Sequence, residues 1–229
     1  MWLGILTIKK EIRANLSPHL QKYGFQYKSD IGGNIGFIDV NNKDSFYVSF
    51  NVFSTGRTRM SRICGYFDSV ERILFNIHLP DKSVQYYYDK PFNSLYHTSI
   101  IDNTNYREKL DSDTLYSRED VQSFCDRVID YMDTRGKEFI ERNNSLEKIY
   151  AQIIHNWKDN NLDPISEHSD NYFKALIILK LMNDPNIEDY KMQFKDRILE
   201  YKNPEAWLKS YQNLCDLLDS PSFEKEHLL

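Results

Sequence analysis

Apolar side chains recur at every third or fourth position near the start of the chain. They are Ile5, Ile8, Ile12, Leu16 and Leu20. This period places them on one face of a helix, so the pattern predicts an amphipathic first helix. The stripe ends near Tyr23, and the next residue, Gly24, is of the type that readily adopts the left-handed conformation found after many helices. We therefore expect the first helix to stop there.

The pattern changes to alternation directly after this glycine. Apolar and polar positions alternate over residues 25–28 and again over residues 46–51, as in half-buried strands. Residues 36–40 are typical of a strand that returns between them, bounded by turn signals at residues 32–34 and 41–44. Because each connection is short, this part of the chain predicts an antiparallel meander that follows one helix.

The middle of the chain is less regular. Residues 63–67 and 84–88 favour strands, and residues 70–77 fit either a short helix or a further strand. Residues 91–115 follow neither period, so they form either a long functional loop or an insertion. Ser117 then begins a helix with an acidic first turn, and we expect its apolar stripe to pack against the meander.

Helical periodicity dominates the last third. Apolar stripes predict helices over residues 146–157, 187–201 and 204–218, and residues 172–182 are apolar nearly all round, as in a buried helix. The predicted fold class is α+β, with an N-terminal helix, an antiparallel β-meander and a covering helix, followed by a C-terminal α-helical bundle. We expect an α+β domain over residues 1–145 and a helical C-terminal region over residues 146–229.

The charge is distributed unevenly between these parts. The 229-residue chain has 29 Lys and Arg against 34 Asp and Glu, a net charge of −5. Residues 1–115 hold 14 basic and 12 acidic side chains, whereas residues 116–229 hold 15 and 22. This balance disfavours a protein that coats nucleic acid through bulk charge. The acidic helical part is where we expect a cationic partner surface to bind.

The expected location is cytoplasmic. The apolar start of the chain precedes its positive charges, Lys9 and Lys10, which is the reverse of the order in a secretion signal. No apolar run approaches the roughly 18 residues of a membrane span, so we expect no membrane association. The cysteines Cys64, Cys125 and Cys215 are an odd number and far apart, which disfavours a disulfide framework.

The sequence contains few patterns that carry catalytic chemistry. Gly32, Gly33 and Gly36 lie between two strand patterns, so they predict a hairpin turn and not a phosphate-binding loop. The six histidines lack metal-binding spacings, and no nucleophile elbow occurs. We therefore expect no catalytic residues, no bound cofactor and no metal.

Clustered aspartates allow two interpretations each. Asp111 and Asp113 could hold a divalent cation, but the residues after them break the calcium-loop pattern, so a solvated loop is favoured. Three aspartates share one face of the helix that follows Ser117: Asp126, Asp130 and Asp133. Like charges at this spacing indicate either a solvated face or contact with a basic partner.

One local concentration of basic residues and one aromatic run form the candidate binding surface. Its residues are Arg57, Arg59, Arg62, Tyr86, Tyr87 and Tyr88, and Arg72 lies close in sequence. Arginines with stacking tyrosines suit single-stranded nucleic acid. The same residue types are enriched in protein interfaces. A third interpretation is structural, with one tyrosine of the run buried and two exposed on a strand.

The N-terminal part resembles a known family. A helix leading into residues 23–28, a glycine-rich turn, residues 46–52 and the later segment 139–142 are similar to a bacterial domain-of-unknown-function family, number forty-three-oh-four. The resemblance extends over roughly residues 5–145. It implies an α+β fold of one helix, an antiparallel sheet and a covering helix, and it transfers no catalytic residue. Some families of similar size and shape serve as immunity proteins that neutralise a toxin, which is an analogy of fold.

Together these observations predict a bacterial, non-catalytic protein–protein interaction module, with an immunity-type inhibitor of a toxin as its specific form. The acidic helical part would then bind a basic surface of the partner. Two alternatives stay open. One is a nucleic-acid-binding protein that uses the arginines and tyrosines. The other is a metal-dependent phosphodiesterase at Asp39, although the sequence lacks the Glu-x-Lys that such an enzyme needs on an adjacent strand.

Overall fold

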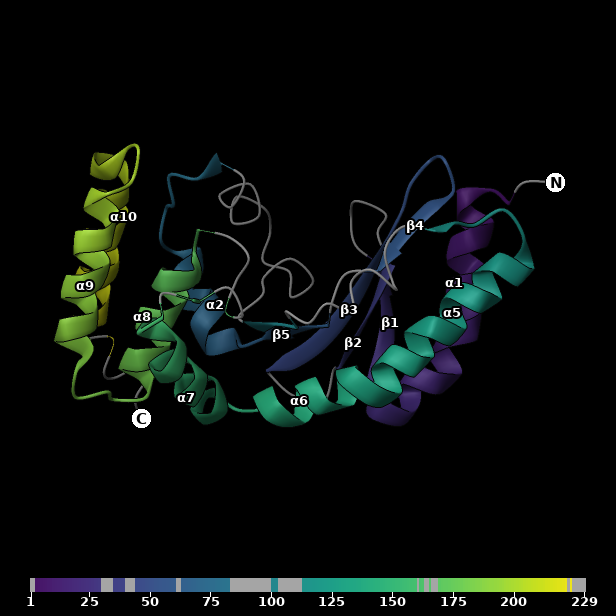
Figure 1. The fold of residues 1–229 in the computed structure, drawn as a ribbon, viewed down its shortest axis with the longest axis horizontal. Coiled ribbons are helices and arrows are strands. Elements are labelled where there is room, and N and C mark those ends of the chain that lie inside the picture. Colours follow the sequence, from purple (N-terminus) through teal and green to yellow (C-terminus); the bar gives the residue numbers. More distant parts are fainter. Residues whose placement is uncertain are drawn as a thin grey trace. The chain divides into compact units, whose positions relative to one another are not determined.

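Two compact units make up the chain in the computed structural model (Figure 1). The structure describes residues 3–29, 35–39, 44–60, 63–82, 100–102, 113–159, 161, 162, 165, 169–221 and 223. The first unit comprises residues 1–66 and 101–144, and the second comprises residues 67–100 and 145–229. The segment 67–100, which interrupts the first unit in sequence, is therefore grouped with the C-terminal helices.

An antiparallel sheet lies at the centre of the first unit. Its strands include β1 (Phe25–Ser29), β2 (Ile35–Asp39), β3 (Ser45–Val52), β4 (Arg57–Met60), β5 (Cys64–Tyr66) and β7 (Asp113–Thr114). In the described part their order is β1-β2-β3-β4-β7, and β5 also pairs with β3. The two-residue strand β6 (Ile100–Ile101) lies where the chain returns to this unit. Phe37 of β2 is opposite Tyr27 of β1 and Val48 of β3, so the first three strands form the predicted meander.

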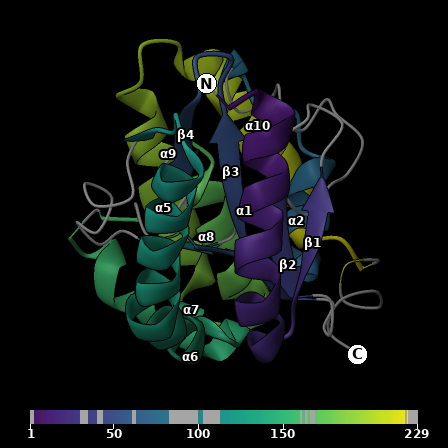
Figure 2. The ribbon, with the colours of Figure 1, turned by 90° about the vertical axis from the view of Figure 1, so that its right-hand side faces the viewer.

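Two helices cover one face of the sheet. Figure 2 shows α1 (Ile5–Leu20) beside α5 (Arg118–Tyr131), with the strands behind them. One buried core joins both helices to the strands, and it includes Ile8, Ile12, Leu16, Leu20, Phe25, Phe37, Val48, Phe50, Phe124 and Val128. Phe50 contacts Phe37 and Phe124 edge to face, with ring centroids 6.2 and 6.1 Å apart. Each fully buried side chain of this size contributes about 1.5–3 kcal/mol to folding.

The end of α1 and the start of α5 follow the sequence signals. α1 continues into a 3₁₀ turn, Gln21–Tyr23, and stops at Gly24, whose φ of 84° is left-handed as predicted. Ser117 caps α5: its Oγ accepts a hydrogen bond from the Asp120 backbone N–H at 3.1 Å. Asp120 Oδ2 accepts in return from the Ser117 backbone N–H at 2.8 Å, which completes a capping box.

The covering helix contains a π-helical turn that the sequence pattern did not predict. The turn, Met132–Gly136, lies between α5 and α6 (Lys137–Asn143). A π-helical turn adds one residue to a helix and rotates the side chains that follow it. Gly136 fits closely here, because a Cβ at this position would lie 3.0 Å from Met132 Sδ. The periodic pattern over residues 121–132 carries no sign of such a local insertion.

Helices form the described secondary structure of the second unit. They are α2 (Asp68–Phe75), α7 (Leu146–Trp157), α8 (Asn171–Leu181), α9 (Ile187–Leu199) and α10 (Pro204–Leu218). α8 contacts the other four, and its residues from Tyr172 to Leu179 are all buried. This central position explains why the segment is apolar nearly all round. Residues 70–77, which fitted either a helix or a strand, belong mostly to helix α2.

A buried ion cluster joins α2 to α8. Lys174 Nζ lies 2.8 Å from Asp170 Oδ2 and 3.3 Å from Glu71 Oε1, and none of the three side chains is more than 3% exposed. Burial alone lowers the pKa of Lys174, but the two carboxylates outweigh it, so that pKa is raised and the amine keeps its charge. The cluster is thus a buried ionic contact in the interior of the second unit.

The predicted α+β fold class is confirmed, with an N-terminal helix, an antiparallel sheet and a helical C-terminal region. β4 was not predicted, because it is short and begins with an exposed arginine. The strand predicted at residues 84–88 and most of segment 91–115 lie outside the described residues. Within the described ranges, no helix combines the length and apolarity needed to span a bilayer. All three cysteines are buried and free of disulfides.

Candidate functional site

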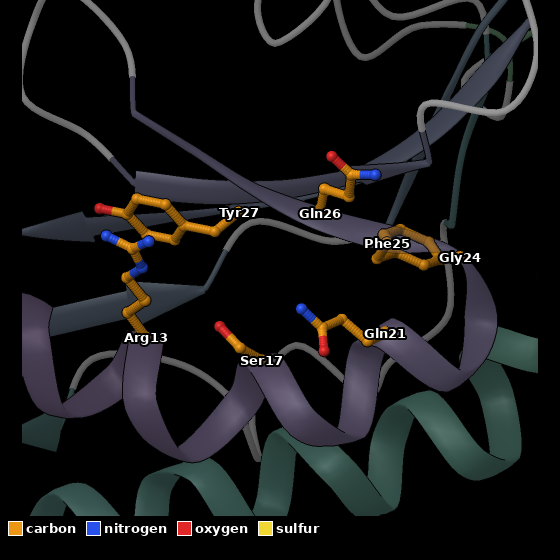
Figure 3. Close-up of a pocket in the computed structure, with 7 residues that line it drawn as sticks. All are labelled: Arg13, Ser17, Gln21, Gly24, Phe25, Gln26 and Tyr27. Carbon is orange, nitrogen blue, oxygen red and sulfur yellow. The ribbon is translucent and has the colours of Figure 1, made fainter.

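A groove with a volume of about 420 Å³ lies between α1 and β1 (Figure 3). We call it the α1–β1 groove. Its lining residues are Arg13, Ser17, Gln21, Gly24, Phe25, Gln26 and Tyr27. The volume is within the roughly 300–1,000 Å³ of typical ligand-binding pockets. The groove lies entirely in the first unit, so its geometry depends on that unit alone.

The groove forms because the chain reverses at Gly24. The left-handed backbone there lets β1 run back along the helix it has just left. Arg13, Ser17 and Gln21 are spaced four residues apart, so they lie in one row beside the buried stripe of α1. Figure 3 shows this row on one side of the groove and β1 on the other.

Arg13 and Tyr27 form one end of the groove. The guanidinium carbon of Arg13 lies 4.4 Å from the centroid of the Tyr27 ring, which is a cation–π contact. Phe37 holds the same ring edge to face, with centroids 5.7 Å apart. The Tyr27 ring is therefore contacted from two sides, and the Arg13 guanidinium carries its N–H donors at the edge of its own plane.

Ser17 and Gln21 continue the row toward the other end, where Phe25 and Gly24 lie (Figure 3). Phe25 also lines this end of the groove through its position on β1, but its side chain is 1% exposed and belongs to the buried core. Among the residues that the structure describes, neither the Ser17 hydroxyl nor the Gln21 amide makes a side-chain hydrogen bond, and Arg13 has no carboxylate partner. The row thus offers donors and acceptors whose capacity is open to a ligand.

The segment that builds the groove is basic in composition. Residues 5–29 contain five Lys and Arg and a single acidic residue, Glu11. Glu11 does not line the groove, and its Oε1 lies 3.2 Å from Nε of Arg118 on α5. The segment that builds the groove therefore has a net charge of +4, within a chain whose total is −5. This charge favours anionic ligands.

The predicted surface of arginines and tyrosines is described only in part. Arg57 and Arg59 lie on β4 and alternate with buried Thr58 and Met60, so the two arginines share the face of the strand away from the core. Arg62, Tyr86, Tyr87 and Tyr88 lie outside the described residues. Arg72 is on α2 in the second unit, where its Nε lies 2.6 Å from Asp68 Oδ2. A common surface of all these residues stays a prediction.

The aspartates have different neighbours. Asp39 is the last residue of β2, opposite Phe25. Asp113 forms an ion pair with Arg127 of α5, and Asp126 accepts a hydrogen bond from Gln122 Nε2 at 2.8 Å. In the described ranges, no group of three or more His, Cys, Asp or Glu side chains is placed to hold a metal ion.

Asp133 lies in the π-helical turn, where it contacts the end of α1. Its Oδ1 lies 2.7 Å from His19 Nε2 and accepts a hydrogen bond from the Tyr23 hydroxyl. The Tyr23 bond, followed by the His19 bond, lowers the pKa of Asp133. The same bond raises the pKa of Tyr23. Asp133 thus binds neighbours within its own unit and is not simply a solvated member of an acidic face.

The groove residues were not found from the sequence. Arg13, Ser17 and Gln21 resemble an ordinary solvated helix face, and only the chain reversal brings Tyr27 against them. One signal was available, namely the excess of basic residues over positions 5–29. This excess is larger than the excess of basic residues in the segment from Arg57 to Arg72, because Asp68 and Glu71 offset part of the charge there.

Comparison with known proteins gives no match, either to a family model, to a curated protein or to a solved structure. The resemblance to family forty-three-oh-four therefore stays a prediction. The candidate site is supported by its own geometry, which is the row of polar side chains opposite β1.

Proposed function

We propose that this protein is a protein–protein interaction module and that the α1–β1 groove is its docking site. The observation that carries the proposal is the row of Arg13, Ser17 and Gln21, whose hydrogen-bonding capacity faces the groove. The Tyr27 ring, which Phe37 contacts edge to face, also belongs to the lining. Arginine and tyrosine are the residue types that contribute most often to binding energy at protein interfaces.

A protein partner fits this lining better than the two alternatives. Ser17 and Gln21 each combine a donor with an acceptor, as peptide groups do, whereas a nucleic-acid backbone offers only acceptors at its phosphates. A phosphodiesterase at Asp39 would need a metal site, and the described residues around Asp39 provide no Glu-x-Lys partner. The immunity-type form, the cytoplasmic location and the bacterial origin stay predictions.

The test is affinity capture with three forms of the purified chain as bait. The first is wild type, the second is Arg13→Glu, and the third is Arg142→Glu. Arg142 is an exposed residue of α6 outside the groove, so the third form matches the charge change without altering the site. We expect a stoichiometric protein partner with wild type and Arg142→Glu, and its loss with Arg13→Glu.

Two results would overturn this proposal. Equal capture by Arg13→Glu would place the docking site elsewhere on the molecule. Capture of nucleic acid in place of protein, removed by nuclease treatment, would favour the alternative function. Circular dichroism of all three baits checks that each is folded; Arg13 is exposed, and within the described part of the chain its replacement removes the contact with Tyr27.

A further inference from the structure

We infer that the α1–β1 groove binds an extended acidic segment of its partner, with one carboxylate seated on Arg13. This inference rests on the proposed docking function and names the chemistry of the ligand. Three features of the groove carry it: a single pre-positioned guanidinium, a row of neutral polar groups at helical spacing, and the basic charge of the segment that builds the site.

The guanidinium of Arg13 suits one carboxylate. The cation–π contact with Tyr27, with the guanidinium carbon 4.4 Å from the ring centroid, restricts the position of the guanidinium, and its N–H groups are available to a ligand. Two parallel N–H···O bonds to a carboxylate are the geometry that this planar group favours. Among the described residues, Arg13 is the single cationic side chain that lines the groove, so one negative charge balances it, while a doubly charged phosphate monoester would be left partly uncompensated.

The neutral part of the row suits an extended backbone. Successive members of the row are four residues apart on a helix, which is a rise of about 6 Å. In an extended chain, residues that point the same way repeat every two positions, about 6.6–6.8 Å. Ser17 and Gln21 can therefore meet alternate peptide groups of one ligand strand.

The length of the row sets the length of the bound segment. Arg13 and Gln21 are eight residues apart, which corresponds to about 12 Å along the helix. An extended chain covers that distance with three to four residues. The recognised unit is thus an acidic residue with the next two or three residues of an extended strand, whose far end lies beside Gln21.

The test uses a fluorescent eight-residue peptide with one glutamate in an alanine–serine background, and a second peptide with glutamine in its place. Fluorescence anisotropy with the purified full chain gives both affinities. We expect the glutamate peptide to bind about ten to a hundred times more tightly, the range for losing a charge-assisted hydrogen-bonded pair. Arg13→Gln should remove this preference, Gln21→Ala should weaken both peptides severalfold, and Arg142→Glu should change neither.

Equal affinity for the two peptides, or a preference that persists in Arg13→Gln, would overturn the inference. Tighter binding of a single-stranded oligonucleotide of eight nucleotides would overturn it too and identify the anion as phosphate. These outcomes are separate from the fate of the proposed function. If the glutamate and glutamine peptides bound equally but a protein partner were still captured through the groove, the docking function would stand and only the acidic ligand would be rejected.

Discussion

Lys174 shows how a single residue can decide the stability of the second unit. Its amine lies between Asp170 and Glu71 with all three side chains at most 3% exposed. Burying these groups is costly, and their attraction offsets that cost only while the set is complete. Replacement of the lysine would leave two carboxylates facing each other in the core, so the loss is larger than that of an ordinary surface ion pair.

We expect Lys174→Met to lower the free energy of unfolding by about 3–5 kcal/mol. Urea denaturation followed by tryptophan fluorescence measures this, because Trp157 and Trp207 both lie in the second unit. Lys195→Met on α9 is the matched control, since Lys195 is exposed, and it should change stability by at most about 0.5 kcal/mol. A loss below about 1 kcal/mol for Lys174→Met would contradict this account of the cluster.

Asp133 gives the first unit a dependence on acid. The hydrogen bonds from Tyr23 and His19 hold the pKa of Asp133 below its ordinary value. A carboxyl whose pKa is lower in the folded than in the unfolded chain stabilises the fold above the unfolded pKa of about 4. That contribution is lost as the pH falls through the folded-state pKa.

We therefore expect Asp133→Asn to lower the urea midpoint of the first unit at pH 7 and to differ less from wild type at pH 3. Far-ultraviolet circular dichroism at both pH values follows this difference. Among the described residues, the Asp126 carboxylate on α5 bonds only to exposed Gln122, so Asp126→Asn serves as the control. If the difference in urea midpoint between wild type and Asp133→Asn grew as the pH fell, the predicted direction of the pH dependence would be wrong.

At the scale of elements, sequence patterns predicted the features that depend on interactions between residues close in sequence. The stripe at Ile8, Ile12 and Leu16 specifies α1 because helical period and burial coincide there. Ser117 marked the start of α5 because its hydroxyl accepts a hydrogen bond from the Asp120 backbone N–H, while the Asp120 carboxylate accepts one from the Ser117 backbone N–H. The sequence pattern gave no sign of the π-helical turn. The apolar stripe extends only to Met132, where the turn begins, so the inserted residue does not interrupt it.

The cap of α5 provides a direct test of this local control. We expect Ser117→Ala to cost about 1 kcal/mol, because Asp120 loses one of its two reciprocal hydrogen bonds. Thermal unfolding of the full chain measures the cost as a drop of several degrees in Tm. Ser123→Ala, within α5 at an exposed position, should leave Tm unchanged or raise it. Equal effects of the two substitutions would exclude the cap as the cause.

At the scale of the whole molecule, the fold class could be predicted but the site could not. Hydrophobic periodicity and short connections were enough to predict the N-terminal helix, the antiparallel meander and the helical C-terminal region. The groove depends on two segments meeting after the reversal at Gly24, and neither Arg13 nor Tyr27 has a sequence neighbour that signals the other. The grouping of segment 67–100 with the C-terminal helices likewise depends on contacts between Glu71 and Lys174, about a hundred residues apart.

The three buried thiols allow each unit to be followed separately. Cys64 and Cys125 lie in the first unit and Cys215 lies in the second. Burial raises the pKa of Cys125 to about 12 and also raises that of Cys215, so neither forms the reactive thiolate in the closed fold. An alkylating reagent therefore modifies each cysteine only when its surroundings open. Peptide mass mapping of one labelling time course would give separate opening rates for the two units, without any engineered probe.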